Sequence, residues 1–139
     1  MKINSAAVIG TGFIGTVHVE SIRRTGVHVK GVLAGNAQST QVGATKLHVD
    51  KAYESLDQIC DDKDVSVVHV TSPNALHYEQ VKQLLTAGKH VVCEKPLALS
   101  AKEGKELVEL AKKTGLVNAT CFNTRFYPMV HEAKHLIST

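Results

Sequence analysis

The chain of 139 residues has no tryptophan, and only 4% of its residues are aromatic. A protein that stacks nucleotide bases on its side chains needs such residues, so this composition argues against a base-stacking surface. Its 16 lysines and arginines are scattered among 13 acidic residues, which leaves a formal charge of +3 and no basic patch for nucleic acid. No apolar run approaches the length of a membrane span, and no signal peptide is recognisable. We therefore expect a cytoplasmic protein with neither a nucleic acid nor a membrane partner.

Cysteine is also scarce. Cys60, Cys93 and Cys121 are an odd number without C-x-x-C spacing, and two of them fall in predicted strands. A thiol in a strand usually packs as a small apolar group. We interpret all three as reduced and structural.

Glycine is well represented where the first apolar run ends. Gly10, Gly12 and Gly15 have G-x-G-x-x-G spacing between a predicted strand over 5–9 and a predicted helix over 13–24. In a dinucleotide-binding turn, the first glycine makes the tight turn, the second lets the backbone approach the pyrophosphate, and the third lets the helix lie close to the strand. The phosphates then lie at the helix N-terminus, where free N–H groups favour negative charge.

Strands and helices alternate along the rest of the chain. Strands are predicted over 5–9, 27–34, 51–53, 65–70, 90–94 and 116–122, with helices over 13–24 and 37–46, after Ser55, from about 74 to Gly88, from Ser100 to Gly115 and after Pro128. Such alternation predicts a single α/β domain with a six-stranded, doubly wound parallel sheet, a Rossmann fold. Ligands of these sheets bind outside the carboxyl ends of the strands.

The end of the second predicted strand bears on the choice of cofactor. An acid there usually binds the ribose 2′-hydroxyl of NAD, but no Asp or Glu occurs between Glu20 and Asp50. Asn36 and Ser39 could donate hydrogen bonds to a 2′-phosphate, or could simply cap a helix. The pattern favours NADP, while the lack of an arginine at this point leaves NAD or use of both open.

Four motifs in order resemble one family. They are the glycine turn at 10–15 with His18, Ser-Pro-Asn-Ala-Leu-His at 72–77, Cys-Glu-Lys-Pro-Leu at 93–97, and Asn-Thr-Arg-Phe at 123–126 with Pro128. Together they resemble the glucose-fructose oxidoreductase, inositol dehydrogenase and MocA (Gfo/Idh/MocA) family. The Glu-Lys-Pro triplet is the most specific of the four, and the motifs span nearly the whole chain.

The resemblance implies an enzyme that transfers hydride between NAD(P) and a sugar, a polyol or a related hydroxy or carbonyl compound. It implies that Lys95 lies beside the nicotinamide and the substrate as the catalytic residue, where a cation can polarise a carbonyl or bind the reacting hydroxyl. Glu94 would orient that ammonium. The cofactor-binding residues expected are Gly10, Gly12, Phe13, Ile14, Gly15, Asn36, Thr71, Ser72, Asn74, His77, Glu94, Lys95, Asn123 and Arg125.

The resemblance also implies two parts. Residues 1–124 would form the NAD(P)-binding domain, and residues 125–139 would begin the connection and helix toward a substrate domain that this sequence lacks. This fragment alone is expected to be inactive, and the full-length enzyme to be a homo-oligomer. The alternative is a sensor or scaffold that binds NAD(P) without turnover.

Other interpretations of single residues stay open at this point. His18 and His77 fit packed, hydrogen-bonded histidines as well as cofactor contacts, Asn74 fits a helix N-cap, and Lys95 fits a surface lysine. His131-Glu132-Ala133-Lys134-His135 matches the H-E-x-x-H zinc motif, but a third protein ligand is needed and only four residues follow. We expect no metal there.

Overall fold

The computed structural model describes residues 3 and 5–138, and six parallel strands form its centre. The strands are β1 (Ser5–Ile9), β2 (His28–Leu33), β3 (Lys51–Ala52), β4 (Val65–Val70), β5 (His90–Glu94) and β6 (Asn118–Cys121). Their order across the sheet is β3-β2-β1-β4-β5-β6. The direction of winding therefore reverses between β1 and β4, which confirms the predicted doubly wound sheet.

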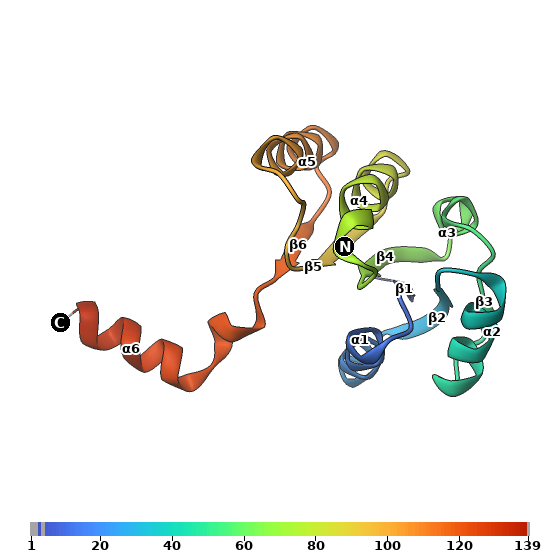
Figure 1. Cartoon of the computed structure of the whole chain (residues 1–139), viewed down its shortest axis with the longest axis horizontal. Coiled ribbons are helices and arrows are strands. Elements are labelled where there is room, and N and C mark those ends of the chain that lie inside the picture. Colours follow the sequence, from blue (N-terminus) through green and yellow to red (C-terminus); the bar gives the residue numbers. More distant parts are fainter. Residues whose placement is uncertain (1–2, 4, 139) are drawn as a thin grey trace.

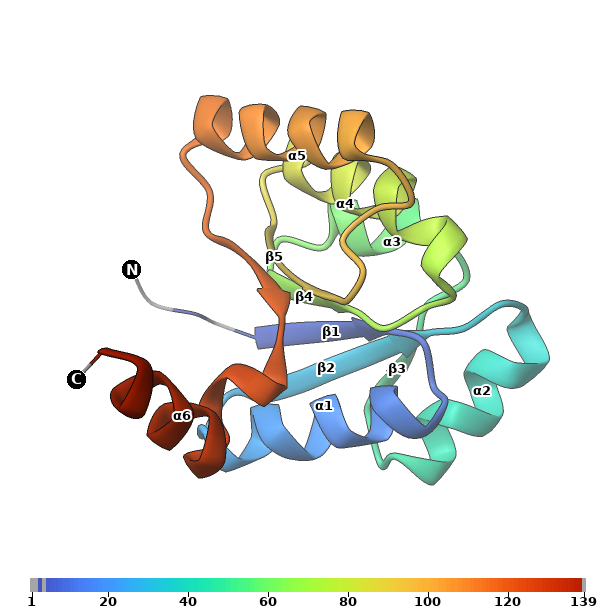
Figure 2. The same ribbon diagram turned by 60° about the vertical axis from the view of Figure 1, so that its left-hand side comes forward.

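Helices cover both faces of this sheet. They are α1 (Phe13–Arg24), α2 (Ala37–Lys46), α3 (Leu56–Asp61), α4 (His77–Thr86), α5 (Ala101–Thr114) and α6 (Pro128–Ser138), with short 3₁₀ turns η1 (Asn74–Leu76) and η2 (Asn123–Phe126). Helices α1 and α2 lie on one face, and α3, α4 and α5 lie on the other (Figures 1 and 2). No helix among the described residues is long and apolar enough to cross a membrane.

The first strand shows why the sheet is buried on both faces. All five residues of β1 are buried, and they alternate between two apolar cores. Ala7 and Ile9 pack with residues of α3, α4 and α5, whereas Ala6 and Val8 pack with residues of α1 and α2. A strand with two buried faces needs a continuous apolar run, which is what the sequence has here.

Most predicted boundaries agree with the structure, and the differences have local causes. Helix α5 has the predicted limits, because the Ser100 side chain and Glu103 form a capping box at its start and Gly115 ends it with a φ of 67°. Ser55 caps α3 as its position predicts, and the Gln58 side chain accepts from the backbone N–H of Glu54, one residue before the cap. The strand predicted over 116–122 is shorter, because this edge strand pairs only with Val91–Glu94 of β5.

The last segment differs from the rest of the chain. Helix α6 points away from the sheet (Figure 1), and every described residue from 122 onward is exposed. Its apolar side chains include Met129, Leu136 and Ile137, which are 66–86% exposed. The apolar side chains of this helix are therefore largely exposed.

Candidate nucleotide-binding site

Two glycines of the turn after β1 are required by packing. Gly10 has a φ of 102°, and a Cβ added there would lie 2.5 Å from the carbonyl oxygen of Thr71. A Cβ at Gly15 would overlap the carbonyl of Gly10. Both glycines therefore let α1 and β4 approach the turn closely, as their spacing predicts.

Gly12 is not required by the fold. Any residue can adopt its φ of −75°, and a Cβ there would meet no described atom within 4 Å. Gly12 is the N-cap of α1, no side chain caps this helix, and its first turn has no acidic residue. Backbone N–H groups and the positive end of the helix dipole thus face open space, which suits the phosphates of a dinucleotide.

A pocket of about 360 Å³ opens beside this turn. Its walls come from the carboxyl ends of β1, β2 and β4 and from the start of α4, and its lining residues are Ile9, Gly10, Thr11, Gly12, Leu33, Ala34, Gly35, Ser39, Ser72, Pro73, Leu76 and Gln80. Of the expected cofactor residues, Gly10, Gly12 and Ser72 line this pocket. Phe13 and Ile14 are not among the lining residues and lie in the first turn of α1, where they are 81% and 42% exposed.

Hydrogen bonds hold the loop after β4 to the glycine turn and to the loop after β5. The Thr71 hydroxyl donates to the carbonyl of Ile9 at 2.8 Å, which ties this loop to the glycine turn. The fully buried His77 ring lies 2.9 Å from the carbonyl oxygen of Ser72 and 2.7 Å from that of Pro96. Both partners are acceptors, so both bonds form together only when each ring nitrogen carries a proton. His77 therefore connects the loops after β4 and β5 from inside the protein, and its ring has no exposed surface with which to contact a ligand.

The Glu94 carboxylate points toward the face of the sheet that carries α1. One oxygen accepts from the backbone N–H of Lys95 at 3.1 Å, and the other lies 3.1 Å from His18 Nε2. Burial opposes its charge, but hydrogen bonds from His18, the Cys121 thiol and the Lys95 amide outweigh burial and lower the pKa of Glu94. The hydrogen bond of Glu94 to residue 95 is thus to the backbone N–H, whereas the resemblance predicts a contact that orients the Lys95 ammonium.

A second, half-buried histidine continues this network. His18 Nδ1 lies 2.9 Å from Nδ1 of His69, which comes from β4. Burial and, to a lesser extent, the neighbouring His18 lower the pKa of His69 to about 4. His18 is thus a packed, hydrogen-bonded histidine, one of the two interpretations that its sequence context left open.

Three other expected residues stand apart from the pocket. Lys95 is exposed directly after β5, and Asn123 and Arg125 are exposed in η2 after β6. Parallel strands place all three at the carboxyl edge of the sheet, the edge of the glycine turn, but none lines the 360 Å³ pocket. Their proposed roles stay predictions.

The structure shows which of two asparagines caps a helix. Asn74 lies exposed in η1, where Pro73 holds the N-cap position and Leu76 holds that of α4, so the interpretation of Asn74 as a helix cap is wrong. Asn36 does cap α2, because its side-chain oxygen accepts from Ser39 N at 2.8 Å and Ser39 Oγ accepts from Asn36 N at 3.3 Å. The oxygen of Asn36 is therefore engaged in the helix.

Sequence reasoning missed several participants. Gln80 lines the pocket and accepts a hydrogen bond from the Ser72 hydroxyl at 2.5 Å. Its only signal in the sequence is its position one helical turn after Leu76, which lines the same pocket. His69 and Cys121 read as ordinary strand residues, and only the fold places them beside Glu94.

The family assignment rests on a match over most of the chain. Residues 5–121 match the profile of the oxidoreductase family with an NAD-binding Rossmann fold. The chain belongs to this Gfo/Idh/MocA family of oxidoreductases. The predicted resemblance is confirmed.

Individual relatives have sugar- or polyol-related names. The chain is 36% identical over 107 residues to the 1,5-anhydro-D-fructose reductase of Ensifer adhaerens, covering 77% of this chain and 32% of the relative. It is 34% identical over 137 residues to the scyllo-inositol 2-dehydrogenase (NADP(+)) IolU of Bacillus subtilis (strain 168), covering 96% and 42%. The crystal structure of an NAD binding oxidoreductase from Klebsiella pneumoniae superimposes with a TM-score of 0.89 at 32% identity, covering 99% and 39%. The chain thus spans about a third to two fifths of the length of these relatives.

Proposed function

We propose that this chain is the cofactor-binding part of an enzyme that transfers hydride between NAD(P) and a CH–OH group of a sugar, a polyol or a related compound. The observation that carries the proposal is the space beside Gly12, where the protein leaves an uncapped helix start and no side chain. The family membership and the names of the relatives support the sugar or polyol class.

The residues of this chain would hold the cofactor in two places. The N–H groups at the start of α1, where Phe13 and Ile14 lie, would bind the pyrophosphate, and the pocket between Gly10 and Ser72 would take the adenosine side. Thr71 and His77 would keep the loops that frame the cofactor in place. The bound nicotinamide would supply or accept the hydride.

Lys95 is our candidate for the catalytic residue. Its side chain is exposed and could therefore face a substrate. Its backbone N–H donates to Glu94, and the next residue, Pro96, is held through its carbonyl by His77. A cation in that place stabilises charge that develops on the reacting oxygen. Asn74, Asn123 and Arg125 would border the nicotinamide half from the neighbouring strand ends.

We further propose NADP(H) as the preferred cofactor. The end of β2 at Ala34–Asn36 has no carboxylate to repel a 2′-phosphate, and the N-terminus of α2 lies directly after it without an acid in its first turn. The relative IolU uses NADP(+), as its name states. A clear preference for NADH in a binding titration would refute this choice.

The substrate domain is part of the same proposal. The relatives are more than twice as long as this chain, and the exposed apolar face of α6 offers a surface for further protein to cover. Residues 1–124 would then form the cofactor domain, with 125–139 leading into the next. Homo-oligomerisation stays a prediction that the mass of the complete protein in solution tests, and the free cysteines suit a reducing cytoplasm.

The test uses the complete protein and compares Lys95→Ala with Lys95→Arg. We expect Lys95→Ala to lower kcat at least ~100-fold on a polyol or sugar substrate, with nucleotide affinity changed by less than about 3-fold, and Lys95→Arg to retain part of the activity. Turnover equal to that of the unaltered enzyme would contradict the role of Lys95. Nucleotide binding without turnover on any sugar or polyol would favour the sensor alternative instead.

A further inference from the structure

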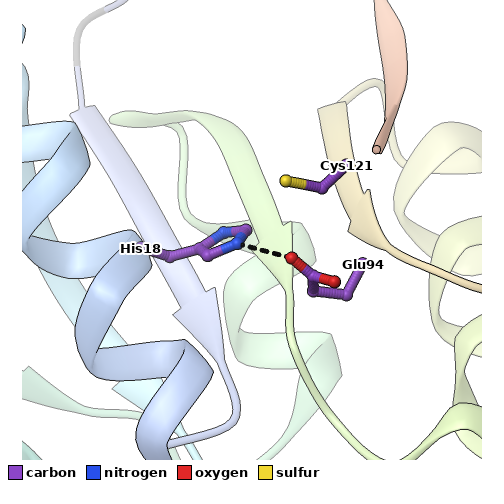
Figure 3. Close-up of side chains that lie close together, drawn as sticks. All are labelled: His18, Glu94 and Cys121. Carbon is purple, nitrogen blue, oxygen red and sulfur yellow. Dashed lines mark hydrogen bonds and ion pairs between the residues drawn. The ribbon is translucent and has the colours of Figure 1, made fainter. Parts of the chain in front are cut away.

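Three side chains with different ligand atoms converge on the face of the sheet that carries α1. His18 comes from α1, Glu94 from β5 and Cys121 from β6, and they point toward one another (Figure 3). His18 Nε2, a carboxylate oxygen of Glu94 and Cys121 Sγ all lie within 4.8 Å of one another. Among the described residues, this is the only group of three such ligand atoms so close together.

The fold makes this meeting possible. Glu94 and Cys121 are directly opposite each other in the parallel register of β5 and β6, so their side chains leave the sheet on the same face. His18 reaches them from α1, because that helix lies across the same face. The His18 and Glu94 side chains are only 8% and 16% exposed, so the cluster is a sheltered site at the edge of the protein core.

We propose that His18, Glu94 and Cys121 bind a zinc ion. Imidazole nitrogen, carboxylate oxygen and thiolate sulfur are the three donor types that Zn²⁺ takes in proteins, at about 2.0–2.3 Å. In a tetrahedral site such ligand atoms are separated by roughly 3.3–3.8 Å. His18 Nε2 and Glu94 Oε1 are already 3.1 Å apart, so a small inward movement of Cys121 Sγ completes the set.

The second nitrogen of His18 is already supported. A histidine that binds zinc through one ring nitrogen usually donates a hydrogen bond from the other, which fixes the orientation of the ring. His18 Nδ1 lies 2.9 Å from His69 Nδ1, so His18 can donate to His69 while Nε2 faces the metal. Glu94 has a matching support, because its second oxygen holds the Lys95 amide at 3.1 Å. Three protein ligands leave the fourth position of zinc to water.

This site is separate from the proposed nucleotide pocket, since none of its three residues lines that pocket. It also gives Cys121 a role that differs from that of the other two cysteines. Cys60 lies in α3 on the opposite face, and Cys93 is fully buried in the core beneath α4 and α5. Of the three cysteines, Cys121 is the one that forms a group with a carboxylate and an imidazole among the described residues.

The experiment titrates the unaltered chain with Zn²⁺, and separately with Co²⁺, in the presence of a non-thiol reductant. We expect one equivalent to bind and the cobalt form to show the near-ultraviolet charge-transfer band of a cobalt–thiolate bond. Cys121→Ser should abolish that band and weaken zinc binding at least ~10-fold, and His69→Ala should weaken zinc binding about 10-fold or more. The control Cys60→Ser should change neither result.

Circular dichroism of each variant separates loss of the site from loss of the fold, and His18→Gln provides a second ligand variant of similar size. Failure of the unaltered chain to bind one equivalent of zinc, or a thiolate band that survives Cys121→Ser, would overturn the proposal. Neither measurement needs a nucleotide or a substrate. The zinc site and the proposed dehydrogenase function can therefore fail independently.

Discussion

At the amino edge of the sheet, charged side chains pair with one another, whereas at the carboxyl edge the glycine turn leaves backbone amides facing open space. Lys30 of β2 lies 2.7 Å from Asp62 and 2.8 Å from Asp64 at the amino edge. At the other edge, Gly12 has no side chain and α1 begins without a cap.

Asp62 is the centre of the amino edge. Besides Lys30, it accepts a hydrogen bond from the buried Tyr53 hydroxyl at 2.9 Å. Burial opposes its charge, but the hydrogen bonds from Lys30 and Tyr53 outweigh burial and hold the pKa of this carboxyl well below its usual range. The buried ammonium of Lys89 donates to the backbone carbonyls of Asp62 and Val65 at 2.6 and 2.9 Å. This edge is closed by interactions within the protein.

The volume of a hollow does not by itself identify a ligand-binding site. The amino edge has a hollow of about 590 Å³, larger than the pocket beside the glycine turn, lined by Ser5, His28, Lys30, Asp50, Lys51 and Asp64. Each of these residues has a partner within the protein. The smaller pocket at the carboxyl edge adjoins N–H groups that no side chain caps, and that difference favours it as the ligand site.

The largest expected effect on stability comes from Asp62→Ala, which removes the central carboxylate of the amino edge. Removing this carboxylate leaves the Tyr53 hydroxyl buried without its acceptor, and that loss alone costs about 2 kcal/mol of the free energy of unfolding. Urea denaturation of the two proteins measures it, with the exposed Asp61→Ala as a control that should stay close to the unaltered chain. Nucleotide affinity of the folded variant should not change.

The same variant makes the pH dependence visible. Because the folded-state pKa of Asp62 is lowered from the model-compound value of 3.8, its stabilising effect is complete well above that value and is lost as the pH falls below it. The difference in unfolding free energy between the unaltered chain and Asp62→Ala should therefore shrink from pH 6 toward pH 3. A difference that stays constant over this range would show that Asp62 does not act through its charge.

Local signals account for most of what the sequence predicted correctly. The glycine spacing at 10–15, the apolar run of β1 and the limits of α5 at Ser100 and Gly115 each depend on a few neighbouring residues, so they can be predicted locally. Gly10 and Gly15 have the packing roles expected of them. Alternation of strand and helix then restricts the topology, because parallel neighbours require a crossover.

Distant contacts account for what the sequence did not reveal. His18 and Glu94 are 76 positions apart, and the pairing of Lys30 with Asp62 spans 32. Their approach depends on the order of the strands across the sheet, which no local pattern encodes. The position of Glu94 at the end of β5 could therefore be predicted from the sequence, but the contacts of its carboxylate with His18 and with the Lys95 backbone could not.

Gly12→Ala tests the open edge, with an effect that should appear mainly in binding. The added methyl group meets no described atom within 4 Å, so the denaturation midpoint should fall only by the modest cost of alanine at the N-cap of α1. The methyl group would, however, fill the space in which we place the pyrophosphate. We expect the affinity for NADPH to fall at least ~10-fold, which is about 1.4 kcal/mol, by fluorescence or calorimetric titration.

A matched control is Gly104→Ala in α5, where a Cβ also meets nothing within 4 Å. Alanine in a helix should raise the unfolding free energy by about 0.5–1 kcal/mol there and leave NADPH affinity unchanged. If Gly12→Ala bound NADPH as tightly as the unaltered chain, the open space would have no part in nucleotide binding, and the contrast between the two edges would lose its functional meaning.

The smallest effect, and the finest test of the open edge, is expected for Asn36→Ala. Loss of the cap of α2 should cost about 1 kcal/mol of unfolding free energy whichever cofactor binds. Because the side-chain oxygen of Asn36 already binds Ser39 N, only its amide group is available to a 2′-phosphate. Titrations with NADPH and NADH separate the two roles: a contact with the phosphate lowers the affinity for NADPH alone, by about 3–10-fold. An equal loss for both nucleotides would mean that Asn36 shapes the helix start and does not select the cofactor.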